Sequence, residues 1–373
     1  METTINKTGV QTSLKGITVE MIDSLDGLLS IRNEIDAFSN VPFLKSSWMY
    51  PWIQTFCSPN ECRLSFLVVK DSESEIIGFA PLAMRESLKR GKHLTFVGSG
   101  KVCSDYMTFP AAPGCESQVA RIVAQWCQDN AKLWDRIELD GVTTDDSTVA
   151  EFAACFEKDG NNAEAVEILP SYRMPLPSSW EEVLRSLSKN SRKKYRRQAR
   201  MLDEKATLHH ATDAESLREG MQILETLHTA RWNSLGEGGC FSFPGFGEFL
   251  GAMAEEKLND GSLSLIWMTV EGQPIAADIG YFRGNGMYTY QGGMSPDHLD
   301  LEPGRAIIKS QIEVAIERGA KFIDFLRGDE PYKSRFITKR IENVRYEIAG
   351  RGTRARMIQS MLVVSRGLKS LMT

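Results

Sequence analysis

The chain has 373 residues, of which 42% are hydrophobic and 25% are charged, and its net charge is −5. This length exceeds one ordinary core and predicts a globular protein of two domains. The negative net charge argues against a general nucleic-acid-binding protein but leaves room for a local basic patch. Seven cysteines without a C-x-x-C pair, and histidines without metal-ligand spacing, predict free thiols, a reducing cytoplasm and no metal.

Residues 1–14 are polar and lack the apolar core of a signal peptide, so we expect a disordered N-terminus and no secretion signal. No apolar run reaches the roughly 18 residues of a membrane-spanning helix. The protein is therefore expected to be cytoplasmic.

The first half of the chain predicts a strand, a helix, a run of antiparallel strands, a second helix and a closing strand. These elements cover residues 17–21, 23–38, 64–97, 117–130 and 136–139. Between the strand run and the second helix lies a Gly98-x-Gly100 turn, followed by Asp105 and Tyr106. The aromatic stretch 42–52 is expected to line the core.

The second half repeats this order of elements. They cover residues 207–210, 213–232, 263–291, 303–318 and 322–326, with an aromatic loop at 241–249. Ala206 lies 189 positions after Ile17, at the first strand, and Ala320 lies 189 positions after Ala131, near the closing strand. An equal offset at both ends indicates that one α/β domain has been duplicated.

We therefore expect two domains, residues 15–175 and 206–350, joined by a basic helix within residues 176–205. An apolar stripe predicts that this helix packs on one side. Its other residues are strongly basic: Lys189, Arg192, Lys193, Lys194, Arg196, Arg197 and Arg200. Three interpretations are open, namely a solvated face, a clamp for a phosphorylated or otherwise anionic acceptor, and a contact with anionic lipid headgroups.

The segment 351–373 carries basic residues among apolar ones and contains no acid. Such a basic amphipathic tail can lie on an anionic membrane surface, or it can dock on its own domain. The first alternative predicts a protein peripheral to the inner face of the membrane.

A charged segment follows the last predicted strand. Asp324 interrupts the apolar run 322–326, and Arg327, Asp329 and Lys333 come soon after it. Charges at the end of a buried strand are costly unless they are paired or solvated, and in open α/β sheets ligands lie beyond the carboxyl ends of strands. The segment therefore predicts either a functional site or a surface loop with solvated ion pairs.

The turn at residues 284–285 fixes the expected register of a hairpin. The expected pairs are Phe282 with Met287, Ile279 with Tyr290, and Asp278 with Gln291. Asp278 lies in the middle of its strand among small residues, where a carboxylate indicates a role or a partner.

The sequence Pro303-Gly304-Arg305-Ala306 begins a helix soon after this hairpin. The unpaired N–H groups and the dipole of a helix N-terminus favour an anion. A CoA pyrophosphate would suit this position, with Arg305 adding charge. The same pattern also begins many ordinary helices.

Several motifs of the second half resemble those of a known family. They are Leu187-Ser188-Lys189-Asn190, Arg231-Trp232, Phe241, Gly272-Gln273-Pro274-Ile275-Ala276, Tyr290 with Gly292-Gly293, Pro303-Gly304, and Asp324-Phe325-x-Arg327-Gly328-Asp329-x-x-Tyr332-Lys333-x-x-Phe336. Together with the element order, they resemble the CelD/BcsL-type acetyltransferases of the GNAT superfamily, which are linked to cellulose and exopolysaccharide biosynthesis. The last motif is also similar to the FemABX aminoacyl-transferases. The Q/R-x-x-G-x-G/A loop of ordinary GNAT enzymes is replaced here by Leu301-Glu302-Pro303-Gly304.

The resemblance implies an α/β fold with a mixed sheet in two tandem GNAT-like domains, and acyl-CoA, foremost acetyl-CoA, as co-substrate. The implied reaction is acyl transfer to an amine or hydroxyl of a sugar- or lipid-linked acceptor in exopolysaccharide or cell-envelope biosynthesis. Two alternatives stay open. One is a FemABX-like transfer from aminoacyl-tRNA, with RNA on the basic helix, and the other is a non-catalytic scaffold that recruits a polysaccharide synthase to the membrane.

The catalytic candidates are Asp324, Asp329, Lys333, Arg327, Tyr290 and Asp278. One carboxylate, from Asp324 or Asp329 ahead of Asp278, would accept the proton of the acceptor. Lys333 and Arg327 would hold an anion or stabilise developing charge, and Tyr290 would protonate the departing thiolate. The expected cofactor contacts are Gln291, Pro303, Gly304, Arg305 and Ala306. The expected substrate contacts are Asp105, Tyr106, Arg231, Trp232 and Tyr332.

Overall fold

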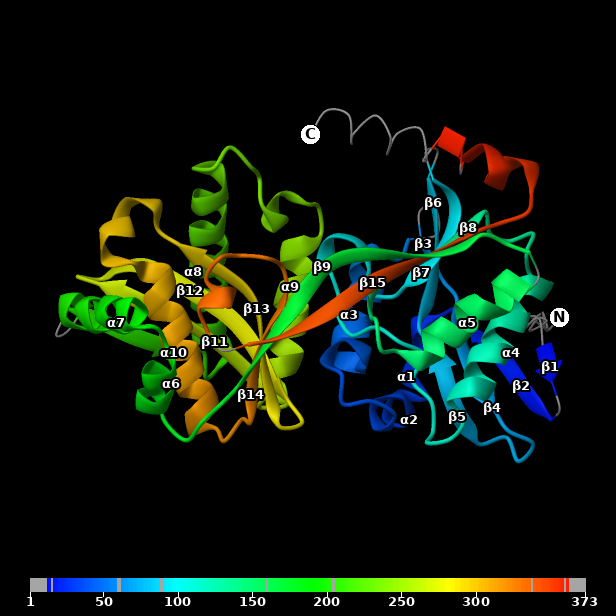
Figure 1. Cartoon of the computed structure of the whole chain (residues 1–373), viewed down its shortest axis with the longest axis horizontal. Helices are drawn as coiled ribbons and strands as arrows, with labels where there is room; N and C mark the ends of the chain where they lie inside the picture. The colour runs from blue at the N-terminus through cyan, green and yellow to red at the C-terminus, as the bar shows by residue number, and fades with distance from the viewer. Residues whose placement is uncertain are drawn as a thin grey trace, which may run out of the picture. The chain divides into compact units, whose positions relative to one another are not determined.

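The computed structural model describes residues 12–361, apart from 15, 59–61, 88–89, 159, 203–204, 337 and 359. The chain divides into two compact units. The N-terminal unit contains Met1–Ile168 and Asn343–Thr373, and the C-terminal unit contains Leu169–Glu342. The chain leaves the first unit along strand β9 (Ala163–Pro175) and returns to it along strand β15 (Lys339–Ala349) (Figure 1).

These limits differ from the expected domains in two respects. The basic segment 176–205 lies inside the C-terminal unit, and residues 343–350 belong to the N-terminal unit. Within residues 1–14, which were expected to be disordered, Thr12–Leu14 forms strand β1, and residues 1–11 lie outside the described part.

The N-terminal unit contains two sheets, with strand orders β1-β2-β4-β5 and β15-β8-β7-β6-β3. Its other elements are β2 (Ile17–Ile22), α1 (Leu25–Leu29), α2 (Arg32–Ala37), α3 (Ser46–Phe56), β3 (Cys62–Leu64), β4 (Phe66–Lys70), β5 (Ile76–Ala80), β6 (Leu82–Ser87), β7 (Gly91–Phe96), α4 (Glu116–Asp129), β8 (Arg136–Thr143) and α5 (Ser147–Lys158). Pro81, which lacks an N–H group, separates β5 from β6. The expected strand run is therefore divided between the two sheets.

The C-terminal unit contains one sheet, with strand order β10-β11-β12-β13-β14-β9. Its elements are α6 (Trp180–Ser186), α7 (Lys189–Leu202), β10 (Ala206–His210), α8 (Ala214–Asn233), α9 (Phe246–Asn259), β11 (Leu263–Val270), β12 (Gln273–Arg283), β13 (Gly286–Met294), α10 (Pro303–Glu317) and β14 (Phe322–Arg327). The expected single helix over 180–202 is two helices, because Leu187 is extended and the Ser188 hydroxyl accepts a hydrogen bond from the N–H of Ser191 at 3.2 Å. Ser188 thus caps a new helix.

The sheet of the C-terminal unit is covered on both faces. In Figure 1, α6, α7 and α10 lie along one face and α8 and α9 along the other. The core on the first face includes Met174, Leu184, Tyr195, Ile266, Met287, Ile312, Ile323 and Phe325. On the second face α8 reaches β13 closely at Gly293, where an added Cβ would lie 2.6 Å from the backbone nitrogen of His228.

Both units contain one pair of adjacent parallel strands that pair over a short length. Gly286–Tyr288 of β13 pair with Phe322–Asp324 of β14, and His93–Thr95 of β7 pair with Arg136–Glu138 of β8. This shared pattern agrees with the predicted duplication, and β2 and β10 begin at Ile17 and Ala206, as the first sequence match requires. In the second match, β8 and β14 begin their parallel pairing at Arg136 and Phe322, which are 186 positions apart instead of 189.

The register of the β12–β13 hairpin changes at a β-bulge. Phe282 pairs with Met287 as expected, but Ile279 pairs with Gln291 and Asp278 with Gly292. Tyr290 is the extra residue of β13. The two pairs expected beyond the turn were therefore wrong by one residue.

Candidate functional site

The candidate site of the C-terminal unit is the place where β13 and β14 part, which we call the β13–β14 split. The strands pair only as far as Tyr288 and Asp324, and the bulge at Tyr290 lies just beyond this point. Gln291 lies on β13 beyond the bulge and is partly exposed. Parallel strands that separate leave backbone groups without a ladder partner, so a ligand can be bound between them.

The N-terminus of α10 offers an anion few backbone donors. Pro303 has no N–H, and the N–H groups of Arg305 and Ala306 donate to the carbonyl oxygen of Glu302 at 2.9 and 3.2 Å. Side chains supply the charge instead. The Glu302 carboxylate lies 3.0 Å from Nε of Arg305 and 3.6 Å from a terminal nitrogen of Arg197 on α7. An anion here would be bound mainly by these two arginines.

Asp278 is buried beside the split, with 4% of its surface exposed. Its Oδ1 accepts a hydrogen bond of 2.7 Å from Nε2 of Gln311 on α10, and the Gln311 amide oxygen accepts one of 2.8 Å from Ser264. Its Oδ2 faces Gly292, an exposed residue where an added Cβ would lie 3.1 Å from that oxygen. Burial raises the pKa of Asp278 to about 8, although the Gln311 hydrogen bond opposes this shift.

Asp324 is fully buried and both of its carboxylate oxygens have partners. Oδ2 lies 2.8 Å from Nε of Arg173, and Oδ1 accepts a hydrogen bond of 2.9 Å from the N–H of Leu326. Leu326 has a φ of 55° within a bulge of β14. This geometry supports a structural role, in which Asp324 stabilises the bulge and pairs with Arg173.

Lys333 is also buried, with 2% of its surface exposed, and it holds the segment that follows β14. Its ammonium group donates to the carbonyl oxygens of Leu326 and Arg327, both at 3.1 Å, and lies 2.8 Å from Oε2 of Glu330. Since an ammonium has three donors, these contacts satisfy it. Lys333 therefore organises this segment and has no donor left for an acceptor substrate.

The other candidates after β14 differ in exposure. Arg327 is partly exposed and Asp329 is exposed. The ring of Tyr332 packs on Phe325 at a centroid distance of 5.8 Å. Burial, followed by the charges of Glu330 and Asp278, raises the pKa of Tyr332 well above its usual value.

Tyr290 belongs to the opposite face of the sheet. Its ring stacks with that of Phe246 at 6.5 Å, and Trp232 lies in the same aromatic cluster, 5.9 Å from the ring of His228. Arg231 is partly exposed on α8. The structure therefore separates Tyr290, Arg231 and Trp232 from Asp278, which faces α10.

One pair of functional groups in this cluster was missed by the sequence. Nε2 of His228 lies 3.3 Å from Sγ of Cys240. Burial lowers the pKa of His228 to about 4 and raises that of Cys240 to about 12, so both side chains are neutral at physiological pH. A loop without a helical or strand pattern separates His228 from Cys240 in the sequence. No sequence pattern therefore predicts that the two side chains are in contact.

Asp105 and Tyr106 belong to the N-terminal unit. Segment 98–107 runs where β7 and β8 part, with hydrogen bonds of 3.3 Å from the Ser104 N–H to the Gly98 carbonyl and 2.9 Å from the Met107 N–H to the Gly141 carbonyl on β8. Asp105 is buried within this segment. The chain itself therefore fills the split of the N-terminal unit, and the structure provides no exposed carboxylate at Asp105 for a substrate.

The start of the basic tail docks on the N-terminal unit. Ala355 and Ile358 are buried, and Arg354 lies 3.4 Å from Asp135 and 3.5 Å from Glu86. The predicted tail beyond residue 361 lies outside the described residues. No helix of the described part is long and apolar enough to cross a membrane.

Within the described residues, no group of three or more His, Cys, Asp or Glu side chains is placed to hold a metal ion. The cysteines described are free thiols.

Three solved structures of similar fold cover most of the chain. FemX has a TM-score of 0.58 and 13% identity, over 84% of this chain and 95% of FemX. The C-terminal domain of a putative lysylphosphatidylglycerol synthetase from Agrobacterium fabrum has a TM-score of 0.54 and 11% identity, over 91% and 97% of the two chains. A tandem GNAT protein from the clavulanic acid biosynthesis pathway has a TM-score of 0.51 and 10% identity, over 90% and 99%.

No curated protein sequence matches the chain. Residues 189–334 match a family model described as an acetyltransferase (GNAT) domain. The similar folds and this match agree on an α/β architecture of two GNAT-like domains. The C-terminal unit therefore contains an acetyltransferase (GNAT) domain, and acyl transfer is the enzyme activity that this domain supports.

Proposed function

We propose that the protein transfers an acyl group from acyl-CoA to an amine or hydroxyl group of a sugar- or lipid-linked acceptor at the β13–β14 split. The observation that carries this proposal is the buried Asp278 carboxyl beside the bulge of β13, inside the segment that matches an acetyltransferase domain. The motifs that resemble the CelD/BcsL-type enzymes favour an acceptor of exopolysaccharide or cell-envelope biosynthesis. They also favour a cytoplasmic protein at the inner face of the membrane.

In the proposed reaction the thioester lies between the parted strands. Backbone N–H groups of β13 next to Tyr290 stabilise the oxygen of the thioester carbonyl as it becomes negative. The acceptor attacks the carbonyl carbon, the carbon–sulfur bond breaks, and the acceptor's proton passes to Asp278. A carboxyl group with a pKa near 8 suits a proton transfer close to neutral pH.

The remaining candidates take supporting roles in this proposal. Arg305 and Arg197 bind the pyrophosphate of the donor, and Glu302 moves away when they do so. Tyr290 protonates the departing thiolate from the other face of the sheet. Arg327 and Asp329 contact the acceptor, whereas Asp324 and Lys333 are positioning residues that hold the segment after β14.

The first test is thermal unfolding of the full chain with acetyl-CoA, longer acyl-CoAs, CoA and ATP. A ligand present at about 100 times its dissociation constant stabilises the folded state by roughly 2.7 kcal/mol, which raises the melting temperature measurably. We expect a shift with acyl-CoAs that Arg305→Ala reduces and that Arg121→Ala, a surface variant of the N-terminal unit, leaves unchanged. If no acyl-CoA raises the melting temperature, the proposed donor is wrong.

The second test concerns Asp278. We expect Asp278→Asn to bind acetyl-CoA as the original protein does but to release no CoA thiol when a panel of amino sugars and their lipid-linked forms is added. Full turnover by Asp278→Asn would remove Asp278 from the mechanism and leave the donor site intact.

A second candidate function is the transfer of an aminoacyl group from tRNA. It is favoured by the basic face of α7, which lies opposite the buried Tyr195, Gln198 and Leu202. The exposed cations on that face are Lys189, Lys193, Arg196, Arg197 and Arg200, whereas Arg192 donates to the carbonyl oxygens of Arg185 and Leu187. Binding of loaded tRNA that weakens steeply with salt, without any effect of acyl-CoA, would favour this function.

A non-catalytic scaffold would instead bind anionic vesicles, lose that binding when residues 351–373 are removed, and show no affinity for acyl-CoA.

A further inference from the structure

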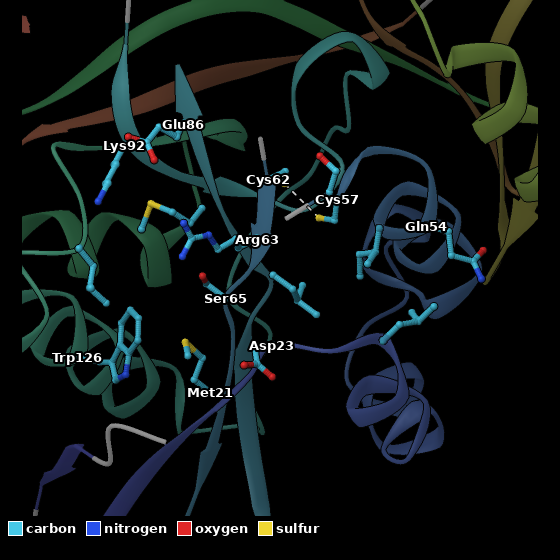
Figure 2. Close-up of a pocket in the computed structure, with 16 residues that line it drawn as sticks. Met21, Asp23, Gln54, Cys57, Cys62, Arg63, Ser65, Glu86, Lys92 and Trp126 are labelled. Carbon is cyan, nitrogen blue, oxygen red and sulfur yellow. Dashed lines mark hydrogen bonds between the residues drawn. The ribbon is translucent and has the colours of Figure 1, made fainter. Parts of the chain in front are cut away.

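The N-terminal unit contains a cavity of about 770 Å³, which Figure 2 shows. Two cations and two acids share its lining, namely Arg63, Lys92, Asp23 and Glu86. Glu86 is also the cross-strand partner of Lys92 in the β6–β7 pair. The charges of this lining are therefore mixed and favour no class of charged ligand, whereas the polar groups around Asp278 in the C-terminal unit have a defined direction.

The Gln311 side chain on α10 is fully buried and can adopt only one orientation. Its Nε2 lies 3.3 Å from the backbone carbonyl oxygens of Ser264 and Asp278, and 2.7 Å from Oδ1 of Asp278. A carbonyl oxygen only accepts hydrogen bonds, so the group that faces these two carbonyls must be the NH₂ group. The Ser264 hydroxyl donates to the amide oxygen on the other side at 2.8 Å, which completes the network.

This orientation determines which oxygen of Asp278 carries its proton. Because the Gln311 NH₂ group only donates, Oδ1 accepts, and the proton of the neutral carboxyl group belongs on Oδ2. Oδ2 has no hydrogen-bond partner among the described residues, and it faces Gly292, the exposed residue that pairs with Asp278 on β13. The proton is therefore held on the oxygen that lies beside the β13–β14 split.

Gly292 leaves the space beside this oxygen free. An added Cβ would lie 3.1 Å from Oδ2 and 3.5 Å from the carbonyl oxygen of Ala277. Gly292 is not among the glycines with a positive φ, so its backbone conformation does not require glycine. What the glycine provides at this position is access to Oδ2.

We propose that Gln311 is a positioning residue and that Gly292 provides access, so that Asp278 exchanges a proton with the acceptor through Oδ2 alone. This inference rests on the proposed acyl transfer. As the acceptor attacks the thioester carbon, its N–H or O–H bond breaks and the proton forms a bond to Oδ2. Once the carbon–sulfur bond has broken and Tyr290 has protonated the thiolate, Oδ2 releases its proton to solvent past Gly292, and Tyr290 takes one from solvent.

The titration of Asp278 reports on this network. Burial raises the pKa of Asp278, and the hydrogen bond from Gln311 opposes this shift. Among the described residues, the charge of Asp278 acts on one other titratable group, Tyr332, whose own pKa lies well above its usual value because the ring is buried. Tyr332 therefore stays neutral while Asp278 titrates, and a change at Gln311 should be visible in the titration of Asp278.

The test is infrared difference spectroscopy of the full chain between pH 5 and 10, which follows the C=O stretch of the protonated carboxyl group. Asp278→Asn identifies the band, because the amide lacks it. We expect a midpoint at about pH 8 in the original protein. Gln311→Met should raise this midpoint by about one pH unit or more, because the ionised carboxylate loses a hydrogen bond. Gln198→Met is the same change at a buried glutamine that donates to the Glu302 carbonyl, and it should leave the midpoint unchanged.

Gly292→Ala tests the access to Oδ2. The added methyl group should raise the same midpoint, because it shields the ionised oxygen from water. It should also lower the release of CoA with the panel of acceptors at least about tenfold, since the proton can no longer reach Oδ2. Gly251→Ala, where the added Cβ meets open space, should change neither quantity.

An unchanged midpoint in Gln311→Met or in Gly292→Ala would overturn the proposal, and so would full turnover by Gly292→Ala. Because Gly292 is exposed, this variant keeps the test decisive even if Gln311→Met does not fold. The midpoints are measured without any substrate. If they move as expected but no acyl-CoA binds, the proposed acyl transfer fails while the placement of the Asp278 proton stands, so the two failures are distinguishable.

Discussion

The protonation of one carboxyl group links stability to pH in the C-terminal unit. Burial raises the pKa of Asp278 from 3.8 to about 8, so the folded protein keeps a proton that the unfolded chain has already lost between these values. The free energy of unfolding should therefore fall as the pH rises from about 4 to about 8 and change little with this group above that range.

This dependence can be measured by urea denaturation at pH 5, 7 and 8.5. We expect Asp278→Asn to flatten the decline, because the amide cannot titrate, whereas Asp329→Asn, at an exposed position, should leave it as it is. If Asp278→Asn shows the same decline as the original protein, Asp278 is not the titrating group.

Lys333 gives a second prediction at the level of single residues. Its replacement by alanine leaves two buried carbonyl oxygens and Glu330 without their partner, so Lys333→Ala should lower the free energy of unfolding by about 2–4 kcal/mol. Lys321→Ala, at an exposed position beside the same strand, should cost less than about 0.5 kcal/mol. A small effect of Lys333→Ala would contradict the structural role given to it here.

The elements of the fold followed largely from the sequence, because their patterns are local. The helices at α8 and α10 and the hairpin turn at residues 284–285 have end signals that stand beside the residues they act on. The bulge at Tyr290 has no such signal, since it depends on the packing of β13 against β12 and the neighbouring helices. The expected partner of Asp278 was wrong for that reason alone.

The sequence predicted only part of the candidate site. The sequence indicated Asp278 and the helix start at Pro303, because a mid-strand carboxylate and a proline before a helix are local features. It could not show that Asp324 and Lys333 are saturated, since their partners Arg173 and the Leu326 carbonyl are defined by tertiary contacts. Nor could it indicate the His228–Cys240 pair.

The contact of α8 with β13 leads to a prediction about elements. Gly293→Ala would place a Cβ 2.6 Å from the His228 nitrogen and 3.0 Å from the Leu224 carbonyl oxygen, both backbone atoms that cannot rotate away. We expect a loss of about 2–4 kcal/mol in the free energy of unfolding, because α8 must move.

Gly251→Ala is the matched control. It lies inside α9 with open space around the added Cβ, and it should stabilise the protein by about 0.5–1 kcal/mol through helix propensity. Circular dichroism during urea denaturation measures both variants. Equal free energies of unfolding for Gly293→Ala and Gly251→Ala would show that the packing of α8 does not depend on a glycine at position 293.

At the scale of the whole molecule, the two copies of the domain are not equivalent. The split of the N-terminal unit is filled by the segment 98–107, whereas no segment among the residues that the structure describes bridges the β13–β14 split in this way. Titration calorimetry should therefore give one acetyl-CoA per chain, and Arg305→Ala should weaken that single site. A stoichiometry of two would mean that a second acetyl-CoA displaces segment 98–107 from the split of the N-terminal unit.

The chain leaves the N-terminal unit along β9 and returns to it along β15, and this path affects the order in which the protein folds during synthesis. The C-terminal unit is continuous in the chain, but the N-terminal unit needs residues 343–349, which pair with β8. The ribosome makes those residues after the whole of the C-terminal unit. The N-terminal unit therefore cannot complete its sheet until the C-terminal unit and residues 343–349 have been synthesised. Until then an edge of β8 is unpaired and open to association with other chains.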